Sequence, residues 1–186
     1  RGIKNLAKIV KEVIGQIKEL GGEPFIISAM GSHGGGTPEG QREVLASYGI
    51  TEENIGVEIV TSVDVVRLGR TSGGIDVYFD SAALGADLIV PINRVKLHTD
   101  FVGDIQSGVC KMLVIGLGNH VGCTAVHEAD FDNFADILIE AAGMIMKHAS
   151  VGFGVAILEN AYDETAMIEA IPAEKIIERE KELVKI

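Results

Sequence analysis

Residues 24–38 read Pro-Phe-Ile-Ile-Ser-Ala-Met-Gly-Ser-His-Gly-Gly-Gly-Thr-Pro. The apolar run Pro24–Met30 predicts a buried strand, because short apolar runs bounded by turn signals are typical of one. Thr37 followed by Pro38 predicts the start of a helix, since a hydroxyl N-cap and a proline at the first helical position are both favoured there. A strand, a glycine-rich loop and a helix in this order are typical of an α/β domain.

The same alternation continues along the chain. Apolar spacing predicts a helix over 5–20, with Asn5 as its N-cap and Gly21-Gly22 as its stop. Residues 111–116 are apolar throughout and fit a helix or a strand. The other expected elements are helices at 38–48, 81–86, 132–147 and 173–185, a hairpin at 67–80, and strands at 57–61, 87–92, 151–158 and 166–171. The fold class is therefore α/β, a mostly parallel sheet with helices on both faces in a Rossmann-like three-layer domain over residues 1–186.

Composition limits the function. The formal net charge of -11 argues against nucleic-acid binding, which needs a basic patch. No apolar run reaches the roughly 18 residues that span a bilayer, and no signal peptide opens the chain, so we expect no membrane partner. Two cysteines, Cys110 and Cys123, are too few for a disulfide framework and fit a reducing, cytoplasmic location. We expect a fragment of a longer two-domain protein, with its oligomeric state open and a homo-oligomer possible.

Three further glycine-rich or basic stretches accompany the loop around His33. Arg94, Lys96 and His98 follow a buried strand, and ligands bind beyond the carboxyl ends of such strands. Cationic and titratable groups this close together predict a carboxylate or phosphate locus. Ser107-Gly108 precede Lys111, which becomes a nucleophile if burial lowers its pKa.

Histidines and a helix N-terminus complete the candidate set. His120 and His127 lie seven residues apart, two turns of a helix. Gly34, Gly35 and Thr37 precede a helix N-terminus, where backbone N–H groups suit an anion. These patterns leave three interpretations open: a metal- or cofactor-dependent enzyme with histidine acid–base chemistry on a small anionic substrate, a zinc-dependent hydrolase using His98, His120 and His127, or a non-catalytic module that binds a phosphorylated metabolite.

Four motifs together resemble the nickel-pincer lactate racemase family, and more closely its lactate racemase-like branch of 2-hydroxy-acid racemases and epimerases. They are Gly31-Ser-His-Gly-Gly-Gly-Thr37, Arg94-Val-Lys-Leu-His98, Ser107-Gly-x-x-Lys111, and Gly116-Leu-Gly-Asn-His120 leading to His127. The resemblance runs from Arg1 to about Asn160. It departs at Gly34, where the lactate racemases carry an arginine, and this points to a different choice of substrate.

The resemblance implies an isomerase that inverts the α-carbon of a small 2-hydroxy acid by hydride transfer to a nickel pyridinium-3,5-bisthiocarboxylic acid mononucleotide. Lys111 would tether this cofactor through a thioamide, and His127 would ligate nickel, with His120 as the alternative. His33 and His98 would be the acid–base pair. The family places its site between two domains, so the C-terminal domain of the same protein is an expected partner. The remaining expected contacts are Ser107, Gly108, Gly34, Gly35 and Thr37 to the cofactor, and Arg1, Arg94 and Lys96 to the substrate.

Overall fold

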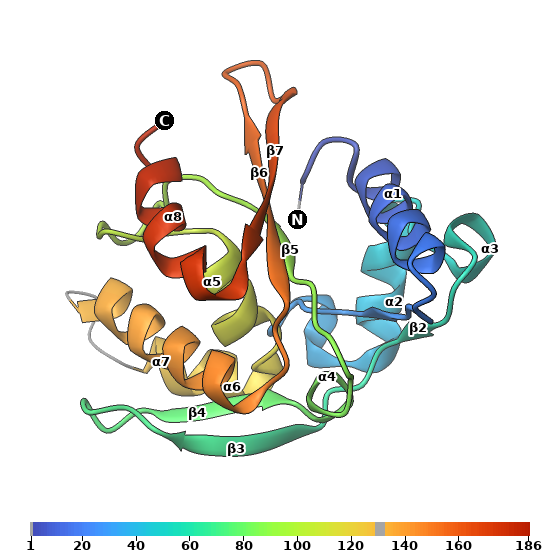
Figure 1. Ribbon diagram of the computed structural model, residues 1–186. Coiled ribbons are helices and arrows are strands. Elements are labelled where there is room, and N and C mark those ends of the chain that lie inside the picture. The colour runs from blue at the N-terminus through green and yellow to red at the C-terminus, as the bar shows by residue number, and fades with distance from the viewer. Residues whose placement is uncertain (1, 129–132) are drawn as a thin grey trace.

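A three-stranded sheet stands at the centre of the computed structural model, which describes residues 2–128 and 133–186 (Figure 1). β5 (Ile92–Arg94) pairs in parallel with β6 (Phe153–Glu159). β6 pairs antiparallel with β7 (Thr165–Pro172). Successive side chains of a strand point to opposite faces, and Ala156 and Leu158 join the largest core cluster while Val155 and Ile157 pack with Ile9 of α1.

Helices cover both faces of this sheet. α1 (Leu6–Glu19) lies on one face, and α5 (Val109–Lys111), α7 (Phe134–His148) and α8 (Ile176–Leu183) lie on the other (Figure 1). The predicted α/β class with helices on both faces is confirmed, although the sheets are small and mix parallel with antiparallel pairs. The remaining helices are α2 (Pro38–Ser47), α3 (Glu52–Ile55), α4 (Ser81–Leu84) and α6 (Asn119–His127), with a π-helical turn at Met112–Gly116 and 3₁₀ turns at Gly34–Gly36 and Ala173–Lys175.

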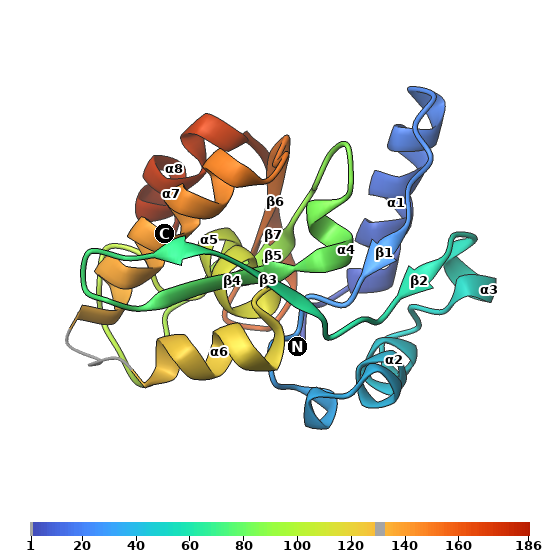
Figure 2. The same cartoon turned by 90° about the horizontal axis from the view of Figure 1, so that it is seen from below.

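Two smaller sheets flank the central one. β1 (Ile26–Ile27) pairs in parallel with β2 (Ile59–Val60) beside α1 and α2. β3 (Val65–Arg70) and β4 (Asp76–Asp80) form the hairpin expected over 67–80. Figure 2 shows this hairpin alongside α6 and α7, away from α1.

The strands begin and end differently from the sequence prediction where the chain cannot continue the ladder. The strand expected over 24–30 is limited to β1, because the chain turns after Ser28, whose carbonyl accepts from Met30 N at 3.1 Å. The strand expected over 87–92 is displaced to β5, with an isolated bridge at Ile89 before it. Pro91 lies between the two and has no N–H to donate.

Helix ends follow local chemistry. Thr37 Oγ1 accepts from Gly40 N at 3.1 Å, so the predicted N-cap of α2 is confirmed. The expected N-cap role of Asn5 is wrong: its side chain makes no capping bond and donates to Thr165 Oγ1 at 3.2 Å. The undecided run 111–116 is helical and its apolar side chains are mostly buried, which explains why it lacks a polar face.

Among the described residues, no single helix is long and apolar enough to cross a membrane. One bent pair, Val109–Gly116 with Asn119–His127, meets the length and composition requirement only when both parts are taken together, across a 107° bend.

Candidate functional site

The loop between β5 and α5 carries His98. Backbone bonds between Lys96 and Ser107, at 2.9 and 3.1 Å, close the base of this loop. Inside it, the buried side chain of Gln106 accepts from His98 N at 2.6 Å. Asp100 N donates to His98 Nδ1 at 3.1 Å. Because Nδ1 accepts, the neutral ring carries its proton on Nε2.

A row of rings joins this loop to α6 and α7. The His98 ring lies 4.4 Å from that of Phe101, which lies 4.6 Å from that of Phe134. Phe134 in turn lies 5.4 Å from the ring of His127. Lys111 Nζ lies 5.9 Å from the centre of the Phe101 ring, within cation–π range. The fold thus brings His98, Lys111 and His127 around one aromatic row.

The electrostatics of this group follow from burial and from clustered cations. Burial lowers the pKa of His98, and Lys111 lowers it further, while Asp100 opposes the change. Burial also lowers the pKa of Lys111, against the opposing effect of Cys123. Lys96 adds to the lowering of both pKa values. Each change favours the neutral base, the form that accepts a proton or attacks an electrophile.

Lys111 also borders a cleft of about 690 Å³. His33, Asn93 and Ser107 line the cleft with it, and apolar side chains of α1 and β1 form much of the remaining wall. Asn93 Nδ2 donates to Gly108 O at 2.7 Å and so fixes the turn before Lys111. The expected tether and the two expected cofactor contacts before it, Ser107 and Gly108, therefore lie in one turn at the edge of this cleft.

The glycine loop places His33 on the same cleft. His33 Nδ1 donates to Met30 O at 2.8 Å, so the neutral ring has its lone pair on Nε2. Gly34 has φ +65°, and a Cβ atom there would lie 2.5 Å from Gln41 N. Only glycine fits this close approach of the loop to α2. Gly35, also in the left-handed region, is exposed, and the Thr37 hydroxyl is engaged in capping α2.

α6 holds the other two histidines in different surroundings. His127 Nδ1 donates to Cys123 O at 2.7 Å, which fixes the orientation of the ring on its own helix. The Cys123 thiol lies 3.7 Å from Ser32 Oγ and links α6 to the glycine loop. His120 is exposed and packs against Gly36, where a Cβ atom would lie 3.3 Å from His120 Cβ. It does not join the aromatic row around His127.

Metal binding by side chains alone is not supported in the described part of the chain. Within residues 2–128 and 133–186, no three His, Cys, Asp or Glu side chains are placed to hold one ion. A zinc hydrolase using His98, His120 and His127 needs such a set.

The residues expected to bind substrate differ in how accessible they are in the structure. Arg94 forms an ion pair with the buried carboxylate of Glu159, so its guanidinium is held by the end of β6. Lys96 is exposed on the loop that carries His98. Arg1 lies outside the described residues.

Sequence motifs did not reveal three residues that shape the site, Phe101, Gln106 and Cys123. The only local signal is that Cys123 precedes His127 by four residues and so shares its helix face. Gln106 and Phe101 act through the closed loop, which the sequence alone does not define.

Comparison with known proteins relates the chain to one protein family and to two solved structures. Residues 2–137 match the family model described as the lactate racemase N-terminal domain. No curated protein matches the sequence. The lactate racemase apoprotein from Thermoanaerobacterium thermosaccharolyticum is structurally similar, with a TM-score of 0.75 and 19% identity over 98% of this chain. This chain spans 46% of that protein.

A second structure has a related fold. The crystal structure of a protein from Thermotoga maritima matches with a TM-score of 0.57 and 15% identity, covering 96% of this chain and 59% of its own. At these identities the structural likenesses show the fold, and the family model covers most of the chain. The chain belongs to the lactate racemase N-terminal domain family.

Proposed function

We propose that residues 1–186 form the cofactor-bearing N-terminal domain of a racemase or epimerase acting on a 2-hydroxy acid. Family membership supports a racemase-type function. One observation carries the finer proposal: a half-buried lysine, Lys111, lies over the Phe101 ring in the aromatic row that joins His98 to His127. The same lysine borders the cleft that His33 lines. The rest of the protein and a small 2-hydroxy acid are its proposed partners, and the cytoplasm its proposed location.

The chain's side chains fit the nickel-pincer nucleotide that the family implies. No acidic group lies within ion-pair distance of Lys111 in the described residues, and burial favours its neutral amine, which bond formation to the cofactor requires. His127 would be the nickel ligand, because it presents an imidazole in the aromatic row beside Lys111 and nickel accepts imidazole. When bound, this group supplies the acceptor and donor of the α-hydrogen as hydride.

His33 and His98 supply the proton chemistry at the substrate hydroxyl. Their hydrogen bonds set complementary tautomers, with a lone pair on Nε2 of His33 and a proton on Nε2 of His98. One ring therefore accepts the hydroxyl proton of one enantiomer while the other returns a proton to form the opposite enantiomer. The roles exchange for the reverse reaction, which a racemase must also catalyse.

Lys96 and the Phe101 ring provide the remaining charge and shielding around the reacting groups. Lys96 is exposed near His98 and offers a positive charge to the substrate carboxylate. The Phe101 ring covers one side of Lys111 and His98 and limits the access of water. Exclusion of water strengthens each charge interaction at the reacting centre.

The test uses the full-length protein loaded with cofactor and a 2-hydroxy acid deuterated at the α-carbon. We expect inversion in ordinary water with the deuterium retained, because hydride does not exchange with solvent. His33→Asn and His98→Asn should each lower the rate about 10²- to 10⁴-fold. His148→Asn, at an exposed histidine bonded to Met144 O, is the matched control and should leave the rate unchanged. Loss of deuterium to solvent, or full activity in both site variants, would contradict the proposal.

A further inference from the structure

A buried carboxylate lies beneath the turn that carries Lys111. Glu180 of α8 is 1% exposed, and its Oε2 accepts from Cys110 N at 3.0 Å. The amide of Val109 also faces this carboxylate. The second oxygen, Oε1, has no hydrogen-bond partner among the residues that the structure describes. Burying a carboxylate this deeply is unfavourable unless hydrogen bonds from its surroundings compensate for the lost hydration.

The turn at Gly108 leaves room for the Glu180 carboxylate only because residue 108 has no side chain. A Cβ atom at Gly108 would lie 2.4 Å from Oε1 and 2.5 Å from Cδ of Glu180. Glycine is therefore the one residue that lets the carboxylate reach the Cys110 amide. On the other side, Asn93 Nδ2 donates to Gly108 O at 2.7 Å. The backbone immediately before Lys111 is held between β5 and α8.

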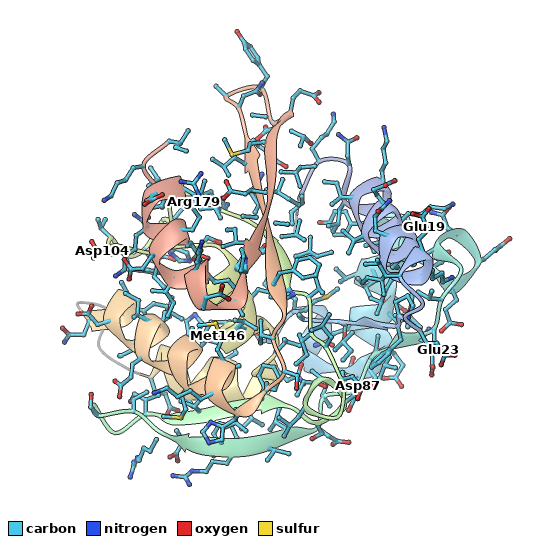
Figure 3. All side chains as sticks on the ribbon, viewed as in Figure 1. Glu19, Glu23, Asp87, Asp104, Met146 and Arg179 are labelled. Carbon is cyan, nitrogen blue, oxygen red and sulfur yellow. The ribbon has the colours of Figure 1, made fainter. Side chains whose placement is uncertain are left out.

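α8 is itself anchored to the sheet. Arg179 donates from Nε to Glu169 Oε1 at 2.8 Å and from its Nη2 to Oε2 at 2.9 Å. This paired contact joins α8 to β7 and has a defined geometry, and Figure 3 shows Arg179 on α8 beside the sheet. Ile176 and Leu183 of the same helix are buried in the main core. Glu180 is thus delivered to the turn by a fixed helix.

We propose that Glu180 is the positioning residue for Lys111: its carboxylate binds the backbone of the turn and so sets where the Lys111 amine enters the site. Glu180 lies beyond residues 2–137, the part of the chain that the family model matches. The inference rests on the proposed function for the role of Lys111, but the contact between Glu180 and the turn stands independently of it.

The position of Lys111 is read from its chemistry in the full-length protein purified without cofactor. We would measure the rate at which an amine-reactive acylating reagent labels Lys111, by mass spectrometry of its peptide, with the exposed Lys8 and Lys11 of α1 as internal standards. Hydrogen exchange at the Cys110 amide gives a second readout that does not depend on activity.

Glu180→Ala should change the labelling rate of Lys111 at least about threefold and speed exchange of the Cys110 amide about tenfold or more, because a hydrogen bond to a charged group is lost. Glu180→Gln keeps an acceptor oxygen and should restore both values. If the alanine variant does not fold, Glu180→Asp, which withdraws the carboxylate by one methylene, should change both values in the same direction. Glu178→Gln removes an exposed carboxylate on the same helix and should leave Lys111 unaffected.

Unchanged Lys111 labelling in the folded alanine or aspartate variant would overturn the inference, as would a glutamine variant that behaves like alanine. These readouts need no cofactor, so they also separate the two proposals. If Glu180 controls Lys111 but Lys111 carries no cofactor in the loaded protein, the proposed function fails while the positioning role stands.

Discussion

Glu180→Gln should change how the stability of the protein depends on pH. Burial raises the pKa of the folded Glu180 carboxyl from 4.5 to about 7, against the opposing backbone hydrogen bonds from Cys110 and Val109. In the unfolded chain the carboxyl is exposed to water and returns to its ordinary pKa. Between these two values the folded state binds more protons than the unfolded state, so the free energy of unfolding falls as pH rises.

The expected magnitude follows from the two pKa values. The rise from 4.5 to about 7 spans about 2.5 pH units, and each unit is worth about 1.4 kcal/mol. Glu180 should therefore contribute a loss of about 3 kcal/mol in the free energy of unfolding between pH 4.5 and pH 8. Below pH 4.5 the carboxyl is protonated in both states and this contribution is constant. The glutamine variant lacks the titration, so its stability relative to the parent should increase by this amount across the same interval.

Urea unfolding at half-unit steps from pH 4.5 to pH 8 measures the difference directly. Exposed pairs such as Arg67–Asp76, in which the Arg67 bond lowers the pKa of Asp76, add their own pH dependence to both proteins and cancel in the difference. Glu178→Gln controls for the change in net charge. A difference between Glu180→Gln and the parent that stays constant within about 1 kcal/mol would refute the buried, titrating carboxylate.

Other substitutions test the packing and the site separately. Gly108→Ala should destabilise the fold by about 1–3 kcal/mol, because its Cβ would collide with the Glu180 carboxylate. Gly143→Ala in α7, where a Cβ atom meets open space, should stabilise the fold by about 0.5–1 kcal/mol. Chemical unfolding measures both changes in the free energy of unfolding, and equal changes for the two variants would contradict the contact between Gly108 and Glu180. Lys111→Met should raise the pKa of His98, since the lysine charge lowers it, and an upward change in the NMR titration midpoint of the His98 ring checks this. An unchanged midpoint would mean that the two groups do not interact.

The sequence predicted well those helices and turns whose ends are set by neighbouring residues, such as a capping side chain or a turn glycine. α2 begins at Pro38 because Thr37 caps it, and the β3–β4 hairpin turns at Gly73-Gly74, with Gly74 at φ +84°. The strands were predicted less well because their length depends on a partner strand. β1 pairs with β2 at Ile26 and Ile27 alone, because the chain turns after Ser28.

For the candidate site too, local features were predictable from the sequence and long-range contacts were not. The sequence indicated which loops carry His33, His98 and Lys111, because each lies in or directly after a glycine-rich or basic stretch. It did not indicate that Arg94 is held by Glu159, or that Glu180 supports a turn 70 residues earlier in the chain. Such contacts depend on which helix packs against which loop, and no spacing within either segment encodes them.

The central claim is that Lys111 carries the cofactor, and the most direct measurement is the intact mass and nickel content of the full-length protein made in cells that also make the pincer cofactor. We expect an added mass that maps to the Lys111 peptide, with near-stoichiometric nickel, and we expect both to be lost in Lys111→Met. An unmodified Lys111 in a preparation that racemises a 2-hydroxy acid at full rate would contradict the claim.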